Sequence, residues 1–323
     1  IGIGKDEAEA LRWYRKAAEA GNANGMNAIG VMYQTGQGVS KDEAEALRWY
    51  RKAAEAGSAN GMFNLGLTYQ YGKGIAKDEA EALRWYRKAA EAGSANGMFN
   101  LGLAYQYGNG VGKDEAEALR WYRKAADAGS ANGMNYIGGM YANGIGIGKD
   151  EAEALRWYRK AAEAGSADAM ANLGGMYDNG TGVGKDDAEA VRWYRKAADA
   201  GSANGMYNLG VMYANGTGIG KDDAEAVHWF RKAADAGNAN GMYNLGVMYA
   251  NGAGIGKDDA EAVRWFRKAA DAGAANGMYN LGVMYANGTG IGKDDAEAVR
   301  WYRKAAEAGY EPAREALQKR GLN

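Results

Sequence analysis

The sequence repeats a 36-residue pattern from one end to the other. The pair Lys-Asp recurs at this interval, from Lys5 and Lys41 through to Lys293, and its phase never slips. All 9 tryptophans keep the same interval, from Trp13 to Trp301. A fixed period between about 20 and 50 residues is typical of solenoids and propellers, in which each repeat packs mainly on its neighbours. The chain is therefore expected to fold as a repeat structure.

The first part of each repeat, KDDAEAVRWYRKAADAG in one copy, predicts a helix with marked ends. Asp6 can accept a hydrogen bond at the helix start while Glu9 reaches back to it, and this capping box recurs in every copy. Gly21 and its equivalents supply a left-handed stop. We call this element the charged helix.

One side of the charged helix is predicted to be buried. Leu11, Tyr14 and Ala18 recur at helical spacing and indicate a buried stripe. Arg15 and Glu19 are expected to pair on the solvent side, because residues four apart are neighbours on a helix surface.

The second part of the repeat, NGMYNLGVMYANG in one copy, also has a helical period, and we call it the second-type helix. Gly25, Ile29, Gly30 and Tyr33 fall on one side when residues are placed at steps of about 100°. The two glycines cost about 1 kcal/mol of helicity each, but they would allow a neighbouring helix to approach closely. Ser or Asn precedes this helix as a candidate N-cap, and Ala274 breaks the series.

Two helices and two short turns in each repeat make a helical hairpin, with no strand signal, so the predicted fold class is all-α. One repeat contains Leu65-Gly66-x-x-Tyr69-x-x-Gly72-x-Gly74-Ile75, then Lys77-Asp78, Ala82, Trp85-Tyr86-x-Lys88-Ala89-Ala90 and Gly93. This pattern resembles the Sel-one-like (Sel1-like) repeat, a relative of the tetratricopeptide repeat, over essentially the whole chain. The resemblance implies a right-handed α/α superhelical solenoid that serves as a protein–protein interaction scaffold, with the first helix of each hairpin on the concave side.

Two departures from that family pattern stand out. The family usually has Pro where this chain has Gly148 or Gly220, and usually Ala where it has Gly25 and Gly61. Both departures are expected to loosen the turns and the contacts within the hairpins.

The repeats predict a single solenoid of about nine Sel-one-like repeats over residues 1–309, the first of which lacks its first helix. Residues 310–323 are predicted to form a C-terminal capping helix, because Pro312 suits a first helical turn and polar residues follow it. The chain opens at Ile1 in the middle of a motif, so a leader or earlier repeats are expected outside it.

Composition excludes several kinds of chemistry. The chain has no Cys and a single His, which excludes a disulfide framework, a thiolate zinc site, a thiol nucleophile and a poly-His metal centre. Its formal charge of −1 gives no attraction to nucleic acid or anionic lipid. No apolar run approaches the roughly 18 residues that cross a bilayer. We predict a soluble periplasmic or cytoplasmic protein with no cofactor, no metal, no nucleic-acid partner and no membrane insertion.

No catalytic residue is predicted. Loop 216–221 is glycine-rich and ends in Lys, like a phosphate-binding loop, but it follows a helix, Asn215 stands where the first glycine belongs and Asp222 replaces the Ser or Thr that would hold magnesium. We interpret it as a structural turn. Asp222 and Asp223 are interpreted as capping residues rather than an acid/base dyad, and His228 as a surface substitution of Arg. The tryptophans are assigned to packing between repeats rather than to a ligand site.

Differences between copies point to the second-type helix as the functional element, because its exposed side varies while the charged helix barely changes. Apart from Lys73, Asp168 and Asp178, the second-type helices and the turns after them carry no ionised group before each Lys-Asp. An uncharged aromatic face usually marks an interaction surface. The residues predicted to contact a partner are Phe63, Leu67, Gln70, Tyr71, Phe99, Leu103, Gln106, Tyr107, Tyr136, Tyr207, Val211, Tyr243, Val247, Tyr279 and Val283.

Tyr207, Tyr243 and Tyr279 would form an aromatic ladder along this face if adjacent second-type helices pack about 8–10 Å apart. The alternative is that these side chains only fill space between neighbouring helices, because stacked repeats must bury something there.

These observations predict a non-enzymatic scaffold that binds a protein or extended peptide in an uncharged groove lined by aromatic, Met and Asn side chains. Three alternatives stay open. The resemblance suggests a bacterial immunity protein that binds and inhibits a secreted phospholipase-type toxin. A hydrolase on the same scaffold is the second alternative, and a consensus-type sequence without an evolved ligand is the third.

Overall fold

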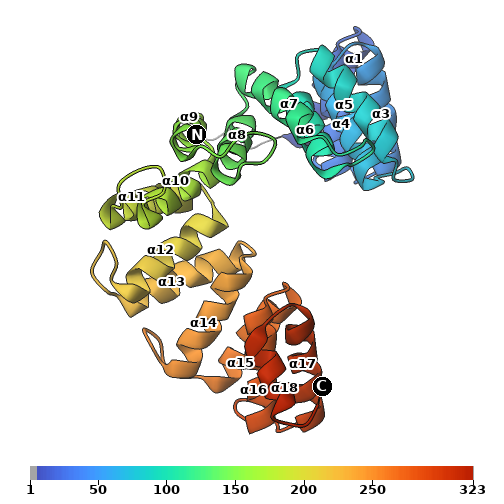
Figure 1. The fold of residues 1–323 in the computed structure, drawn as a ribbon. Helices are drawn as coiled ribbons and strands as arrows, with labels where there is room; N and C mark the ends of the chain where they lie inside the picture. The colour runs from blue at the N-terminus through green and yellow to red at the C-terminus, as the bar shows by residue number, and fades with distance from the viewer. Residues whose placement is uncertain (1–5, 323) are drawn as a thin grey trace. The chain divides into compact units, whose positions relative to one another are not determined.

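The structure, a computed structural model, describes residues 6–322, which are helical throughout with short turns and contain no strand (Figure 1). The chain divides into two compact units, residues 1–164 and 165–323. Lys5, with which the Lys-Asp series begins, and Ile1 lie outside the described residues.

The first unit contains α1 (Glu7–Glu19), α2 (Ala23–Thr35), α3 (Glu43–Glu55), α4 (Ala59–Tyr71), α5 (Glu79–Glu91), α6 (Ala95–Tyr107), α7 (Glu115–Asp127), α8 (Ala131–Asn143) and α9 (Glu151–Glu163). The second contains α10 (Ala167–Asn179), α11 (Asp187–Asp199), α12 (Ala203–Asn215), α13 (Asp223–Asp235), α14 (Ala239–Asn251), α15 (Asp259–Asp271), α16 (Ala275–Asn287), α17 (Asp295–Glu307) and α18 (Glu311–Gln318).

Charged and second-type helices alternate along the chain. The charged helices are α1, α3 and the other odd-numbered elements to α17, and the second-type helices are α2, α4 and the other even-numbered elements to α16. Within each unit every helix packs on the next one in the chain, and neighbouring second-type helices such as α2 and α4 also touch. The all-α solenoid of hairpins predicted from the sequence is therefore confirmed.

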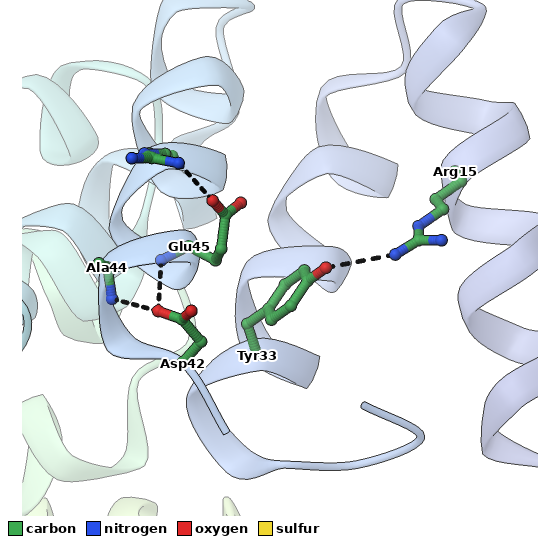
Figure 2. Close-up of polar contacts among 6 residues, drawn as sticks. Arg15, Tyr33, Asp42, Ala44 and Glu45 are labelled. Carbon is green, nitrogen blue, oxygen red and sulfur yellow. Dashed lines mark hydrogen bonds and ion pairs between the residues drawn. The ribbon is translucent and has the colours of Figure 1, made fainter. Parts of the chain in front are cut away.

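The Asp N-cap of the charged helices is as predicted, but the return hydrogen bond from the third helical residue is not formed. The Asp42 carboxylate accepts hydrogen bonds from the backbone N–H groups of Ala44 and Glu45 at 3.0 and 2.9 Å (Figure 2). The prediction that Glu45 reaches back is wrong. The Asp42 N–H donates instead to the carbonyl oxygen of Tyr33 at 2.9 Å, at the end of the preceding helix, and the Glu45 carboxylate pairs with Arg48. Each charged helix from α3 to α17 is thus hydrogen-bonded at its start to the helix before it.

The ends of the second-type helices follow the sequence pattern. Ser58 Oγ accepts from the N–H of Gly61 at 3.1 Å, and the other Ser and Asn residues at this position cap their helices in the same way. Ala274 gives α16 no side-chain cap, as predicted. Each second-type helix ends in a left-handed glycine such as Gly36, with φ of 78°. A Ser or Asn cap at the start, in all but α16, and a left-handed glycine at the end therefore set the limits of these thirteen-residue helices.

The two glycines of the second-type helix are the points of closest helix contact. A Cβ at Gly30 would lie 2.6 Å from the Tyr50 ring of the next charged helix, and a Cβ at Gly61 would lie 2.6 Å from Ala53 Cβ of the preceding one. The predicted close approach is confirmed. The expectation that Gly25 and Gly61 loosen the hairpins is wrong, because the helices move together until the space of the missing methyl group is filled.

The charged helices from α3 to α15 bury the whole predicted stripe, whereas α17 buries only its Tyr302 and leaves Val299 and Ala306 half-buried. Leu11 and Ala18 are buried, but Tyr14 is 40% exposed, whereas its equivalent Tyr50 is 1% exposed. No second-type helix precedes α1 among the described residues, so Tyr14 has no glycine to lie against. Arg15 does not pair with Glu19; its guanidinium donates to the Tyr33 hydroxyl at 3.2 Å (Figure 2).

The turn that joins a second-type helix to the next charged helix contains a position that only glycine can occupy. Gly110 has φ of 72°, and a Cβ on it would lie 2.4 Å from the carbonyl oxygen of Glu79 at the start of α5. Gly112, two residues later, has no atom within 4 Å of such a Cβ. The turn is thus packed at one glycine and open at the next.

This difference predicts opposite outcomes for two alanine substitutions in one turn. Gly110→Ala should lower the free energy of unfolding by about 1–3 kcal/mol, because both the left-handed backbone and the backbone contact resist a side chain. Gly112→Ala should leave it unchanged within about 0.5 kcal/mol. Urea unfolding followed by circular dichroism measures both, and equal losses for the two variants would contradict this description of the turn.

Candidate partner-binding face

Most of the residues predicted to contact a partner lie on the side of the second-type helices opposite the buried positions of Ile29 and Leu65, and they border the glycine that meets the next charged helix. Most of them are half-buried, since each leans on the core of its own or the next hairpin: Phe63, Leu67, Phe99, Leu103, Tyr136, Tyr207, Val211, Tyr243, Val247, Tyr279 and Val283. Gln70 and Gln106 are half-buried as well. Tyr71 and Tyr107 stand out, with 62% and 60% of their surface exposed. The face is therefore neither sealed within the core nor fully in solvent.

The aromatic rings of this face pair with buried rings of the following charged helix. The ring centres lie 5.9 Å apart in Phe63–Tyr86, 5.7 Å in Phe99–Tyr122 and 6.1 Å in Tyr207–Phe230. Such tilted aromatic pairs contribute roughly 0.5–1.5 kcal/mol beyond the area that they bury. Each of these paired rings is thus supported by a ring of the core.

Consecutive second-type helices are linked by polar groups. The Asn64 amide donates to Asn27 Oδ1 at 2.8 Å, and Tyr243 hydrogen-bonds Asn280 at the same relative position. No ring contact joins Tyr207 to Tyr243 in the part of the chain that the structure describes. The structure therefore has asparagine links where the sequence analysis expected an aromatic ladder.

A hydrogen bond joins this face to the core in the first unit. The hydroxyl groups of Tyr50, Tyr86 and Tyr122 donate to the side-chain oxygens of Gln34, Gln70 and Gln106, respectively; the first is 2.5 Å and the third 2.6 Å long. In the second unit Tyr194 meets Asp178 at 3.4 Å. Where the acceptor position is Ala, the ring is a phenylalanine in two repeats, Ala214 with Phe230 and Ala250 with Phe266, and a tyrosine in two others, Ala142 with Tyr158 and Ala286 with Tyr302.

The predicted contact residues Gln70 and Gln106 are therefore engaged with the core. Sequence reasoning missed this pairing, since it treated the exchange of Tyr for Phe and the loss of Gln as separate events. A partial signal was present in residues sixteen apart, because every Gln at this position stands with Tyr and both phenylalanines stand with Ala, although Ala142 and Ala286 also stand with Tyr.

Burial controls the ionisation of these core hydroxyls. Desolvation raises the pKa of Tyr50, and it raises that of Tyr86 and Tyr122 together with their tyrosine neighbours. For Tyr86 that neighbour is Tyr71, and for Tyr122 the neighbours include Tyr107. Each exposed tyrosine thus stands beside a Tyr–Gln pair, and the core hydroxyls are neutral donors at physiological pH.

Shallow hollows recur along this face of the first unit with the period of the repeat. One is lined by Gln70 and Tyr86 from one hairpin and by Asn100 and Leu103 from the next. A second has Gln106, Tyr107 and Ile145 around it. Gln106 and Ile145 stand one repeat after Gln70 and Asn109, which lines the first hollow. The two hollows therefore occupy equivalent places in successive repeats.

The opposite side of each hairpin holds the charges and the tryptophans. Trp85 packs on the core cluster of Leu47, Tyr50 and Leu65 in the preceding repeat, so the predicted inter-repeat packing of the tryptophans is confirmed. The Lys88 ammonium lies 4.1 Å from the Trp85 ring centre, and this stacking recurs in every charged helix. Trp13, which has no preceding hairpin among the described residues, is 60% exposed.

The remaining candidates for chemistry have structural roles. A Cβ on Gly218 would lie 2.2 Å from the carbonyl oxygen of Asp187, so loop 216–221 is a turn packed on α11. Asp222 caps α13, Asp223 pairs with Lys221, and His228 is exposed with its ring edge-on to Trp229. Residues 6–322 contain no cluster of His, Cys, Asp and Glu able to hold a metal ion. In the same range, every helix is too short or too polar to cross a membrane.

The fold and the repeating hairpin define a helical-repeat solenoid, a class of protein that typically serves as an interaction scaffold. A model of the Sel1 repeat matches residues 1–22, 23–58, 59–94, 95–130, 131–166, 167–202, 203–238, 239–273 and 275–310. The chain therefore belongs to the Sel1 repeat family.

Solved structures of bacterial proteins are similar to this chain. A Sel1 repeat protein from Oxalobacter formigenes is 30% identical with a TM-score of 0.64, over 99% of this chain and 94% of that one. The protein c5321, described as a protective antigen of uropathogenic Escherichia coli with an SLR fold, is 34% identical with a TM-score of 0.61, over 98% of this chain and 75% of that one. Immunity protein Pa5087 from Pseudomonas aeruginosa is 19% identical with a TM-score of 0.49, over 68% of this chain and 83% of that one. A comparison with curated proteins finds no match.

The Tyr–Gln pair predicts a strong coupling between its two members. Tyr86→Phe should cost about 1 kcal/mol of unfolding free energy, because Gln70 loses its donor in a half-buried site. Adding Gln70→Ala should recover part of that loss, since the double variant reproduces the natural pair Ala214 and Phe230. A double-mutant cycle in urea gives the coupling energy, and strict additivity would contradict the role of this hydrogen bond.

The raised pKa values of the buried tyrosines predict a loss of stability in base. Folding favours the neutral phenol of Tyr50, Tyr86, Tyr122 and Tyr194, so this contribution is complete below about pH 10 and is lost as the pH rises above it toward the raised folded-state values. Urea midpoints should fall at about pH 11, and they should fall less in the variant with Tyr86→Phe and Gln70→Ala. A loss of equal size in both proteins would assign the effect to other groups.

Proposed function

We propose that the chain is a non-enzymatic scaffold that binds a protein or an extended peptide on the face of its second-type helices. The observation that carries the proposal is the contrast between the two sides of the hairpin. The second-type helices and their turns are almost free of charge and carry half-buried aromatic and aliphatic side chains, while ion pairs line the charged helices. Sel1 repeat proteins generally act as scaffolds that bind other proteins, and they are generally not enzymes.

The face has the physical character of an interface core. Its rings are fixed by pairs such as Phe99–Tyr122, so little side-chain freedom is left to lose on binding. Aromatic residues on a rigid support are the usual centres of binding energy. Polar groups such as Asn100 line the hollows between the rings and supply hydrogen bonds that orient a bound chain.

Two of the alternatives from the sequence stay open. That the chain is an immunity protein against a phospholipase-type toxin stays a prediction. A consensus-type sequence without an evolved ligand would leave the face with no preferred partner, so the binding measurement below also tests it.

Charge placed on the uncharged face should abolish partner binding. A partner co-purified with the chain should bind it with micromolar or better affinity by calorimetry, and Leu103→Glu should weaken that binding at least tenfold, since a carboxylate would be desolvated at the interface. Arg120→Glu is the matched control. Arg120 lies on the exposed side of α7, the charged helix that packs on α6, and its substitution should have little effect. Recovery of no partner at micromolar concentration, or loss of binding in the control alone, would contradict the proposal.

The proposal that the chain is not an enzyme is tested separately. A panel of esters and β-lactams should show no turnover above the uncatalysed rate. A turnover that one Asp or Ser substitution removes would overturn it.

A further inference from the structure

Two adjacent repeats of the first unit carry a feature that the others lack. Tyr71 and Tyr107 end α4 and α6, and the equivalent positions in the other repeats are Thr35, Asn143, Asn179, Asn215, Asn251 and Asn287. Both rings are more than half exposed, and neither hydroxyl has a hydrogen-bond partner among the described residues. An exposed aromatic pair of this kind has no role in the packing of the repeats, because the repeats without it stack in the same way.

The spacing of the two rings matches one polypeptide conformation. Tyr71 and Tyr107 occupy the same position on α4 and α6, which are in contact, so we expect the two rings to be about as far apart as packed helices usually are, about 8–10 Å. A polyproline II helix has three residues per turn and a rise of about 3.1 Å per residue, so side chains on one edge recur about every 9 Å. Every third residue of such a ligand would therefore meet one tyrosine.

We infer that the pair Tyr71 and Tyr107 is a docking site for a polyproline II segment with proline or another apolar residue at every third position. Proline-rich segments dock on aromatic grooves because their conformation is already fixed and little entropy is lost. Their carbonyl groups are free of internal hydrogen bonds, so they can accept from the free tyrosine hydroxyls. The inference deepens the proposed function and rests on it.

The charge next to the pair adds a second requirement on the ligand. Lys73 is the one ionised residue among the second-type helices and following turns of the described first unit, and its ammonium lies 5.5 Å from the Tyr71 ring centre. It has no acidic partner among the described residues, whereas Lys77 and Lys113 pair with Glu79 and Glu115. A ligand with an acidic side chain beside its proline repeat would complement this charge.

The hollows beneath the pair support the same register. Tyr107 lines one hollow, and Gln70 and Tyr86, next to Tyr71, line the hollow one repeat earlier. A segment that lies across α4 and α6 would thus meet one hollow in each repeat while its prolines rest on the two rings.

Selection from a displayed library of short random peptides tests the inference. The library is selected on the immobilised full chain and counter-selected on the variant with Tyr71→Ala and Tyr107→Ala, whose exposed positions predict unchanged thermal stability. The peptides recovered should carry proline or apolar residues with period three and an acidic residue at a fixed distance from them. Their affinity, measured by fluorescence anisotropy, should fall at least tenfold in the double variant and several-fold with Lys73→Ala. Thr35→Ala, at the same position of another repeat, is the control and should bind like the native chain.

The possible results separate this inference from the proposed function. Peptides without period three, peptides that bind helically, or no peptide that distinguishes the native chain from the double variant would each overturn the inference. If the recovered peptides lack period three but lose affinity for the Leu103→Glu variant, the face binds polypeptide and only the inferred polyproline II site is wrong. The test with the co-purified partner decides the proposed function independently.

Discussion

The contact between a glycine and an aromatic ring sets the geometry of every internal hairpin. Gly30 lies under Tyr50, and in the second unit Gly210 lies under Phe230, each so close that a single methyl group would collide with the ring. The ring can enter the core only because the glycine has no side chain. Beside this contact, Phe63 and Gln70 of the second-type helix also touch Tyr86, the ring that lies on Gly66. The candidate binding face is thus held by the same ring that closes the core.

The charges and the candidate binding face lie on different helices of the hairpin. The charged helices carry ion pairs such as Glu81–Arg84 and the stacked Lys88 and Trp85, and exposed pairs of this kind contribute little to stability but keep the surface hydrated. The second-type helices are relieved of that task, so their outer side can vary from repeat to repeat without loss of solubility. This division explains why the residues that change along the chain, such as Phe63, Asn135 and Tyr207, gather on one face.

The elements that local chemistry determines could be predicted from the sequence. The 36-residue period, the Ser58 cap and the paired glycines Gly25 and Gly30 act within one repeat, and they gave the helices, their ends and their buried sides. The contacts that were missed join different elements. The Asp42 N–H is taken by Tyr33, Arg15 turns to the Tyr33 hydroxyl, and Gln70 is held by Tyr86. Each of these depends on the distance between two helices, which periodicity alone does not give.

The central claim is that the face of the second-type helices, and not the charged side, meets the partner. Side-chain footprinting of the chain with and without a bound partner tests it most directly, since the two sides carry different reactive residues. The account predicts that Tyr71, Tyr107 or their neighbours Leu67 and Leu103 lose reactivity while the exposed rim of the charged helices keeps it. Protection of the tryptophans and their stacked lysines, with the tyrosines left reactive, would contradict it.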